Sequence, residues 1–107
     1  MPTFEERERS EEAKFKHDQE LAFKVRNRRN KLFGLWVARE HLGLEGEAAL
    51  AYAKDVVMAD FEGPGDDDML DKVKADLSAR GIELSDHLLR KHLAECEAEA
   101  REQIRKE

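Results

Sequence analysis

The sequence predicts an all-α fold: a small four-helix bundle preceded by a mobile, partly helical N-terminal arm. Apolar residues recur every three to four positions in several segments, the spacing that places them on one face of a helix. The 107 residues include only two prolines and six glycines, so most of the chain lacks helix breakers. No segment shows the alternating pattern typical of a strand. We therefore assign residues 1–18 to the arm and residues 19–107 to the bundle.

The arm is almost entirely polar and supplies little material for a hydrophobic core. Thr3 and Glu6 have the spacing of a capping box, which predicts a helix from the start of the chain. Opposite charges three or four residues apart, such as Glu5 with Arg9, each stabilise a helix by about 0.2–0.5 kcal/mol. An isolated helix of this length is only marginally stable in water, so we expect the arm to fray.

The first helix of the bundle is expected to run from Gln19 to Leu42, with Gly43 as its C-terminal cap. Gly34 lies inside it, although glycine in a helix costs about 1 kcal/mol relative to alanine. A close crossing of another helix explains this glycine, and a hinge is the alternative. An arginine must fill one step of the buried face, which comprises Leu21, Val25, Arg28 or Arg29, Leu32 and Trp36.

The second and third helices follow from their apolar stripes and from the break between them. The second is expected at residues 46–61, with the stripe Ala49, Leu50, Ala53, Val56, Val57 and Phe61. Residues 62–65 contain two glycines and a proline, which predict a break. The aspartates at residues 66–68 then supply an N-cap and favourable charge for the third helix, which should end at Gly81. Its stripe is Met69, Leu70, Val73 and Leu77.

The fourth helix is expected to begin at Ser85 or Asp86, with the stripe Leu89, Leu93, Cys96, Ala100 and Ile104. His92 and Cys96 lie at i and i+4 on one face of it, a spacing that zinc ligands use. Because Cys96 belongs to the apolar stripe and two more ligands are missing, a buried structural cysteine is the favoured interpretation. The aspartates at residues 66–68 lack the alternating spacing of a calcium loop, so no metal is expected there either.

Composition restricts the possible functions. The chain carries 25 acidic residues against 19 lysines and arginines, a formal net charge of −6. It has no Gly-rich phosphate loop, nucleophile elbow or paired-cysteine motif, so we expect no enzyme. It also lacks an apolar run of about 18 residues that could cross a bilayer, and an apolar core of a signal peptide. The single cysteine cannot form an internal disulfide, which fits a reducing cytoplasm.

One segment departs from the acidic character of the chain. Residues 21–36 carry five positive charges and no acid: Lys24, Arg26, Arg28, Arg29 and Lys31. A localised cationic field suggests a binding face, although a solvated helix surface is the simplest interpretation. Nucleic acid would need such a cluster, but the net negative charge opposes it. A nucleotide phosphate is the third interpretation, and its candidate residues are Lys24, Arg28, Arg29 and Trp36, with Phe33 as an alternative aromatic surface.

Most of the chain resembles the zeta subunits of bacterial F-type ATP synthases, a family of ATPase inhibitors. The resemblance covers about residues 4–80 and rests on FEERERSEEAKFKHDQELAFKVRNRRNKLFGLW, followed by VVMADFEGPGDDDMLDKVKADL. It implies a four-helix bundle with a mobile N-terminal inhibitory segment. In that family the segment enters a catalytic interface of the soluble head and blocks ATP hydrolysis by stopping the rotor. The implied partners are the alpha, beta and gamma subunits of the head.

The resemblance implies that the inhibitory segment is Met1 to about Asp18. Its preferred contacts, chosen by their chemistry, are Phe4, Arg7, Arg9, Lys14 and Phe15. The two phenylalanines either pack onto the bundle or anchor the arm in a partner's groove as it becomes ordered. The alternative functions are a regulatory module that binds ATP or ADP and, less favoured, a helical nucleic-acid-binding protein. We expect a cytoplasmic protein, monomeric when free, that binds no nucleic acid and is peripheral to the inner membrane through the synthase.

Overall fold

The computed structural model describes residues 4–61, 63 and 65–107, with side chains from residue 18 onward. Within these residues the chain is all-α and contains no strand, which confirms the predicted fold class. The helices are α1 (Phe4–Trp36), α2 (Gly46–Ala59), α3 (Asp67–Ser78) and α4 (Asp86–Lys106), and a short π-helix, η1 (Val37–His41), continues α1. No helix in the described part of the chain is long and apolar enough to cross a membrane.

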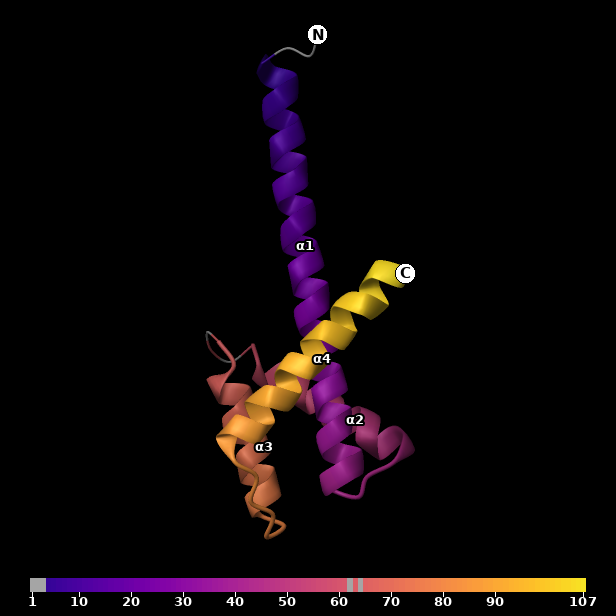
Figure 1. Ribbon diagram of the computed structural model, residues 1–107, viewed down its shortest axis with the longest axis vertical. Coiled ribbons are helices and arrows are strands. Elements are labelled where there is room, and N and C mark those ends of the chain that lie inside the picture. Colours follow the sequence, from indigo (N-terminus) through magenta and orange to yellow (C-terminus); the bar gives the residue numbers. More distant parts are fainter. Residues whose placement is uncertain (1–3, 62, 64) are drawn as a thin grey trace.

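The C-terminal half of α1 is the central element of the bundle. It packs against both α2 and α4, and α3 packs on α2 (Figure 1). The N-terminal half of the same helix extends away from the other helices (Figure 1). Because 33 residues of α-helix measure about 50 Å, α1 dominates the 65 Å long axis of the molecule. The predicted arm and the first bundle helix are therefore parts of one helix, and the mobility of the arm stays a prediction.

The buried face of α1 is rotated by about one position from the predicted stripe. Phe33 and Val37 are fully buried, whereas Leu21 is 41% exposed. Leu32 and Trp36 are only half-buried. Arg29 is buried, which confirms that an arginine fills one step of the inner face. The apolar residues alone mispredicted this face, because two polar residues belong to it.

The stripes of α3 and α4 were predicted correctly, and that of α2 only in part. All four residues of the α3 stripe are buried, as are the first four of the α4 stripe. On α2, the buried residues are all small: Ala49, Ala53, Val56 and Ala59. Leu50 is 47% exposed and Phe61, which lies beyond the end of the helix, is 55% exposed. The expected burial of Leu50 and Phe61 was wrong, because α2 approaches α1 closely and buries a narrow face.

Gly34 lies at that close approach. A Cβ atom at Gly34 would lie 2.7 Å from the Cα of Ala53 and 3.2 Å from the Cβ of Val56. Real Cβ contacts are essentially never shorter than 3.0 Å, so α2 could not sit here against any larger residue. The predicted helix crossing is confirmed.

The helix ends follow the expected signals with one exception. Gly43 ends the α1–η1 segment with a φ of 68°, a conformation that glycine adopts readily. The hydroxyl of Ser85 caps α4 by accepting a hydrogen bond of 3.1 Å from the backbone N–H of Leu88. Asp66 occupies the N-cap position of α3, but its side chain makes no capping hydrogen bond. Its carboxylate is instead paired with an arginine of α1, Arg29.

Candidate functional site

The basic side chains of α1 separate into two sets with different surroundings. Arg26 and Arg29 face acidic residues at the C-terminal end of α2, at the start of α3 and in the middle of α4. Lys24, Arg28 and Lys31 line an open groove on another side of α1. Since adjacent side chains of a helix project about 100° apart, one basic run supplies two surfaces.

The first set is part of a polar network that connects all four helices. Arg29, which is 8% exposed, donates a hydrogen bond of 2.7 Å to Asp66 at the start of α3. It also lies 3.6 Å from Glu97 of α4. Burial of a charge is tolerable only when it is paired and hydrogen-bonded, and Arg29 meets both conditions. The interpretation of the basic run as a solvated surface is therefore wrong for Arg29.

Asp60, at the C-terminal end of α2, is the buried acceptor of the same network. Its Oδ2 atom accepts hydrogen bonds from Arg26 Nε at 2.5 Å and from Asn30 Nδ2 at 2.7 Å. The hydrogen bond to Asp60 raises the pKa of the Arg26 guanidinium. Asn30 is fully buried and in turn accepts a hydrogen bond from Arg29 Nε at 3.0 Å. Through these contacts, Arg26, Arg29 and Asn30 hold the helices together.

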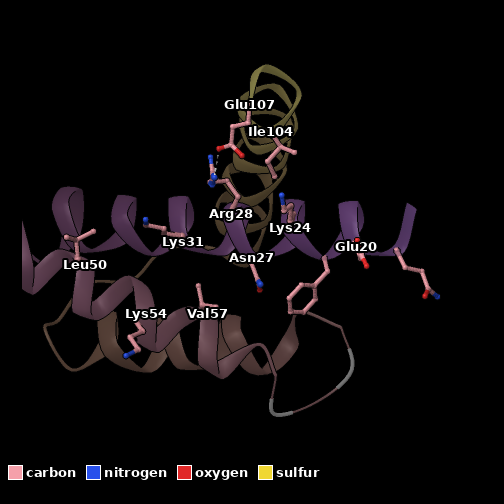
Figure 2. Close-up of a pocket in the computed structure, with 12 residues that line it drawn as sticks. Glu20, Lys24, Asn27, Arg28, Lys31, Leu50, Lys54, Val57, Ile104 and Glu107 are labelled. Carbon is pink, nitrogen blue, oxygen red and sulfur yellow. Dashed lines mark hydrogen bonds and ion pairs between the residues drawn. The ribbon is translucent and has the colours of Figure 1, made fainter. Parts of the chain in front are cut away.

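The second set lines a groove of about 890 Å³ between α1, α2 and the C-terminal end of α4 (Figure 2). Its apolar residues include Phe23, which is 53% exposed, and Leu50. Lysines lie around them on two helices. The lining residues are Gln19, Glu20, Phe23, Lys24, Asn27, Arg28, Lys31, Leu50, Lys54, Val57, Ile104 and Glu107. The sequence did not reveal the groove, because its position depends on which side of α2 faces α1.

Arg28 is held at the wall of this groove by α4. It donates hydrogen bonds of 2.9 Å to Gln103 and 2.6 Å to Glu107, and Figure 2 shows its side chain directed toward Glu107. Among the residues that the structure describes, Lys24, Lys31 and Lys54 form no ion pair. The uncompensated positive charge of the groove therefore belongs to the lysines.

Trp36 lies in a different aromatic cluster. Its ring stacks on the imidazole of His92 with a centroid separation of 3.8 Å and an interplanar angle of 18°. His41 contacts the indole edge-on at 4.8 Å, and Phe33 lies 5.8 Å away. Burial lowers the pKa of His92. The charge of Glu95 opposes this shift, and His41 reinforces it. The cluster joins the end of α1 and η1 to α4, and its burial of His92 disfavours the protonated imidazole.

We expect His92 to make the stability of the protein sensitive to mild acid. Its folded-state pKa lies below the unfolded value, so its contribution is present above about pH 6.5 and is lost as the pH falls through the folded-state pKa. Urea unfolding at pH 7.5 and at pH 5.0 should show a larger loss for the wild type than for His92→Gln. Equal losses in the two proteins would contradict this assignment.

The structure brings together only some of the residues considered for a nucleotide site. Lys24 and Arg28 line the groove, whereas Arg29 belongs to the polar network and Trp36 to the aromatic cluster. Phe33 is fully buried, so it offers no aromatic surface, and that expectation was wrong. The arm positions Phe4, Arg7, Arg9, Lys14 and Phe15, and the Thr3–Glu6 capping box, lie outside the residues whose side chains are described.

The residues considered for metal binding make contacts within the fold instead. Cys96 is buried, as predicted, and burial raises the pKa of its thiol to about 11. His92 Nδ1 lies 3.3 Å from Glu95. In the described part of the chain, no cluster of three or more His, Cys, Asp or Glu side chains could hold a metal ion. Asp66 and Asp67 pair with Arg29 and Arg90.

A comparison with known protein families finds a match that covers nearly the whole chain. The family model described as ATPase inhibitor subunit zeta matches residues 1–103 of the chain. The match therefore includes the N-terminal part of α1 and almost all of α4. No protein with a curated function is significantly similar to the chain.

Proposed function

The chain belongs to the family of ATPase inhibitor subunit zeta, and we propose that it blocks ATP hydrolysis by inserting its N-terminal arm into the catalytic head of an F-type ATP synthase. An inhibitor subunit of this kind is regulatory rather than catalytic. The proposed site of insertion is an interface of the alpha, beta and gamma subunits, where a helix would obstruct the rotor. On this proposal the protein is cytoplasmic and peripheral to the membrane through its partner.

The observation that carries the proposal is the continuity of α1. Its C-terminal half is fixed in the bundle by α2 and α4, while its N-terminal half extends outward as a helix (Figure 1). An obstacle to rotation must transmit force to an anchored body, and a continuous helix does so better than a flexible linker. Inhibition also requires that one rotary state binds the arm best, and each 1.4 kcal/mol of difference shifts the populations about tenfold.

The proposed contacts combine aromatic anchors with positive charge. Phe4 and Phe15 would enter apolar pockets, and Arg7, Arg9 and Lys14 would meet acidic or carbonyl groups of the head. Aromatic and arginine side chains commonly supply most of the binding energy of an interface. Ordering of the arm at the moment of binding would reduce the net affinity while allowing a long, thin segment to insert.

Removal of residues 1–18 is expected to abolish inhibition of ATP hydrolysis and to leave the bundle folded, because every buried residue of the described part lies beyond it. The measurement is ATP hydrolysis by the purified synthase head with increasing inhibitor, beside circular dichroism of each variant. Phe4→Ala/Phe15→Ala in the full chain should weaken inhibition, whereas Leu88→Ala, at an exposed apolar position of α4, should not. Full inhibition by the truncated protein would refute the proposal.

Regulation by ATP or ADP is the less favoured alternative: the groove supplies clustered lysines, but they lie on two different helices. Lys24, Lys31 and Lys54 leave positive charge available beside the exposed ring of Phe23. A nucleotide there would be held without Arg29 or Trp36, which have other partners. Amide signals of the groove would then shift on addition of ATP alone.

A further inference from the structure

Part of the apolar surface of α2 has no partner in the bundle. Leu50, Lys54 and Val57 lie at i, i+4 and i+7, so they share one face of the helix, and all three line the groove beside α1. The neighbouring face, with Ala49 and Ala53, packs in the core. A helix with two adjacent apolar faces, one packed and one open, is typical of a surface that receives another element.

The open face continues onto the other two helices that border the groove. Phe23 supplies an aromatic ring from α1, and Ile104 supplies an aliphatic side chain from the last turn of α4. The ring of Phe61 lies 6.0 Å from that of Phe23 and is also exposed, which extends the apolar surface toward the end of α2. The groove is thus apolar on both walls.

Positive charge surrounds this apolar floor. Lys24, Lys31 and Lys54 line the groove, and in the described residues none of them has an acidic partner. The two acids that line it are Glu20 and Glu107, and Glu107 is already paired with Arg28. On a chain with a net charge of −6, a local excess of lysine favours a negatively charged occupant.

We propose that the groove binds an acidic amphipathic helix of a partner protein. Apolar residues of that helix at i, i+3 or i+4, and i+7 would fill the space between Phe23, Leu50 and Ile104, and its Asp and Glu residues would face the lysines. Gln19 and Glu20 line the groove where α1 leaves the bundle, so the bound helix lies at the base of the arm. This inference rests on the surface of the bundle and goes beyond the inhibitory role of the arm.

A helix fits the chemistry of the groove better than a small anion does. Sites for small molecules present a few polar groups that converge on the ligand. Here the charged groups without an ion-pair partner include three lysines, and Figure 2 shows Lys31 and Lys54 on different helices. Lysine side chains hold their charge in water over an apolar stem, an arrangement suited to the margin of a helix-binding groove.

The test is a titration of the full-length, 15N-labelled protein with a synthetic peptide of about 18 residues, five helical turns, that carries leucines on one face and glutamates on the other. Amide shifts are expected in three segments, namely residues 19–31, 50–57 and 104–107. A matched peptide with lysine in place of every glutamate should bind at least tenfold more weakly. Equal binding of the two peptides, or shifts outside these segments, would overturn the proposal.

Charge-reversal variants test whether the acidic peptide binds in the groove. Lys31→Glu/Lys54→Glu should weaken binding of the acidic peptide at least tenfold, because two attractive charge pairs become repulsive. Arg39→Glu/Lys91→Glu changes the net charge equally at two exposed positions outside the groove and should leave the affinity unchanged. Phe23→Ala should also weaken binding, whereas Leu21→Ala, on the other side of the same helix, should not.

Other occupants give different results in the same titration. Shifts of the groove signals by ATP, without an effect of the peptide, would assign the groove to nucleotide and overturn the proposal. Shifts that depend on protein concentration without peptide would assign it to a second copy of the chain, with the same consequence. The synthase is absent from these measurements, so their outcome is independent of the truncation that tests inhibition by the arm.

Discussion

Asp60→Ala is expected to lower the free energy of unfolding by about 3 kcal/mol, because it leaves the buried amide of Asn30 without an acceptor. It also removes the partner of Arg26, whose side chain is 43% exposed and can recover hydration. The loss compares with a total stability of about 5–15 kcal/mol for a domain of this kind. Urea unfolding followed by circular dichroism measures it directly.

Two further variants separate charge from hydrogen bonding at Asp60. Asp60→Asn keeps an acceptor for Asn30 but removes the charge, so it should cost less than alanine. Asp60→Ala/Asn30→Leu also removes the unpaired Asn30 amide, so part of the lost stability should return, and the part that does not return includes the acceptor that Arg29 Nε loses. Asp71→Ala, at an exposed acid of α3, is the matched control and should change stability by less than about 0.5 kcal/mol. A loss no larger than that of Asp71→Ala would show that the network does not stabilise the fold.

The sequence predicts the helices well. It also predicts the buried face of a helix well where that face consists only of apolar residues. The stripe of α3 has four large apolar residues at ideal spacing, and all four are buried. Gly34 was also informative, because a glycine inside a helix indicates that a neighbouring backbone comes close, and α2 does so here. These features depend on local periodicity and on the volume of single side chains, which are readable in one segment at a time.

The inner face of α1 could not be predicted in the same way. Asn30 and Asp60 are 30 positions apart and both are polar, so neither carries a local signal of burial. Their pairing exists only after α2 has crossed α1. The same crossing turns Leu50 toward the groove, although its spacing on α2 suits a core residue equally well. No local sequence signal distinguishes an apolar residue that packs in the core from one that stays exposed in a groove.

Gly34→Val is expected to destabilise the bundle by about 3 kcal/mol, the upper part of the usual range for overpacking. The new Cβ would overlap the Cα of Ala53, a backbone atom, so the helix α2 itself must move. Gly34→Ala should destabilise less, because alanine gains about 1 kcal/mol in helix propensity against the clash. Thermal or urea unfolding of the full chain measures both variants.

The controls for Gly34 distinguish the two explanations of this glycine, a close helix crossing and a hinge. Ala51→Val, at an exposed position of α2, introduces the same β-branched side chain and should cost only its helix propensity, up to about 0.7 kcal/mol. Ala53→Gly combined with Gly34→Ala removes the 3.2 Å contact to Ala53 Cβ but keeps the 2.7 Å contact to its Cα, so it should restore little. A Gly34→Ala protein at least as stable as the wild type would instead favour the hinge, because alanine would then only stiffen α1. The crossing predicts the opposite sign, since two helix backbones cannot both keep their positions around an added carbon.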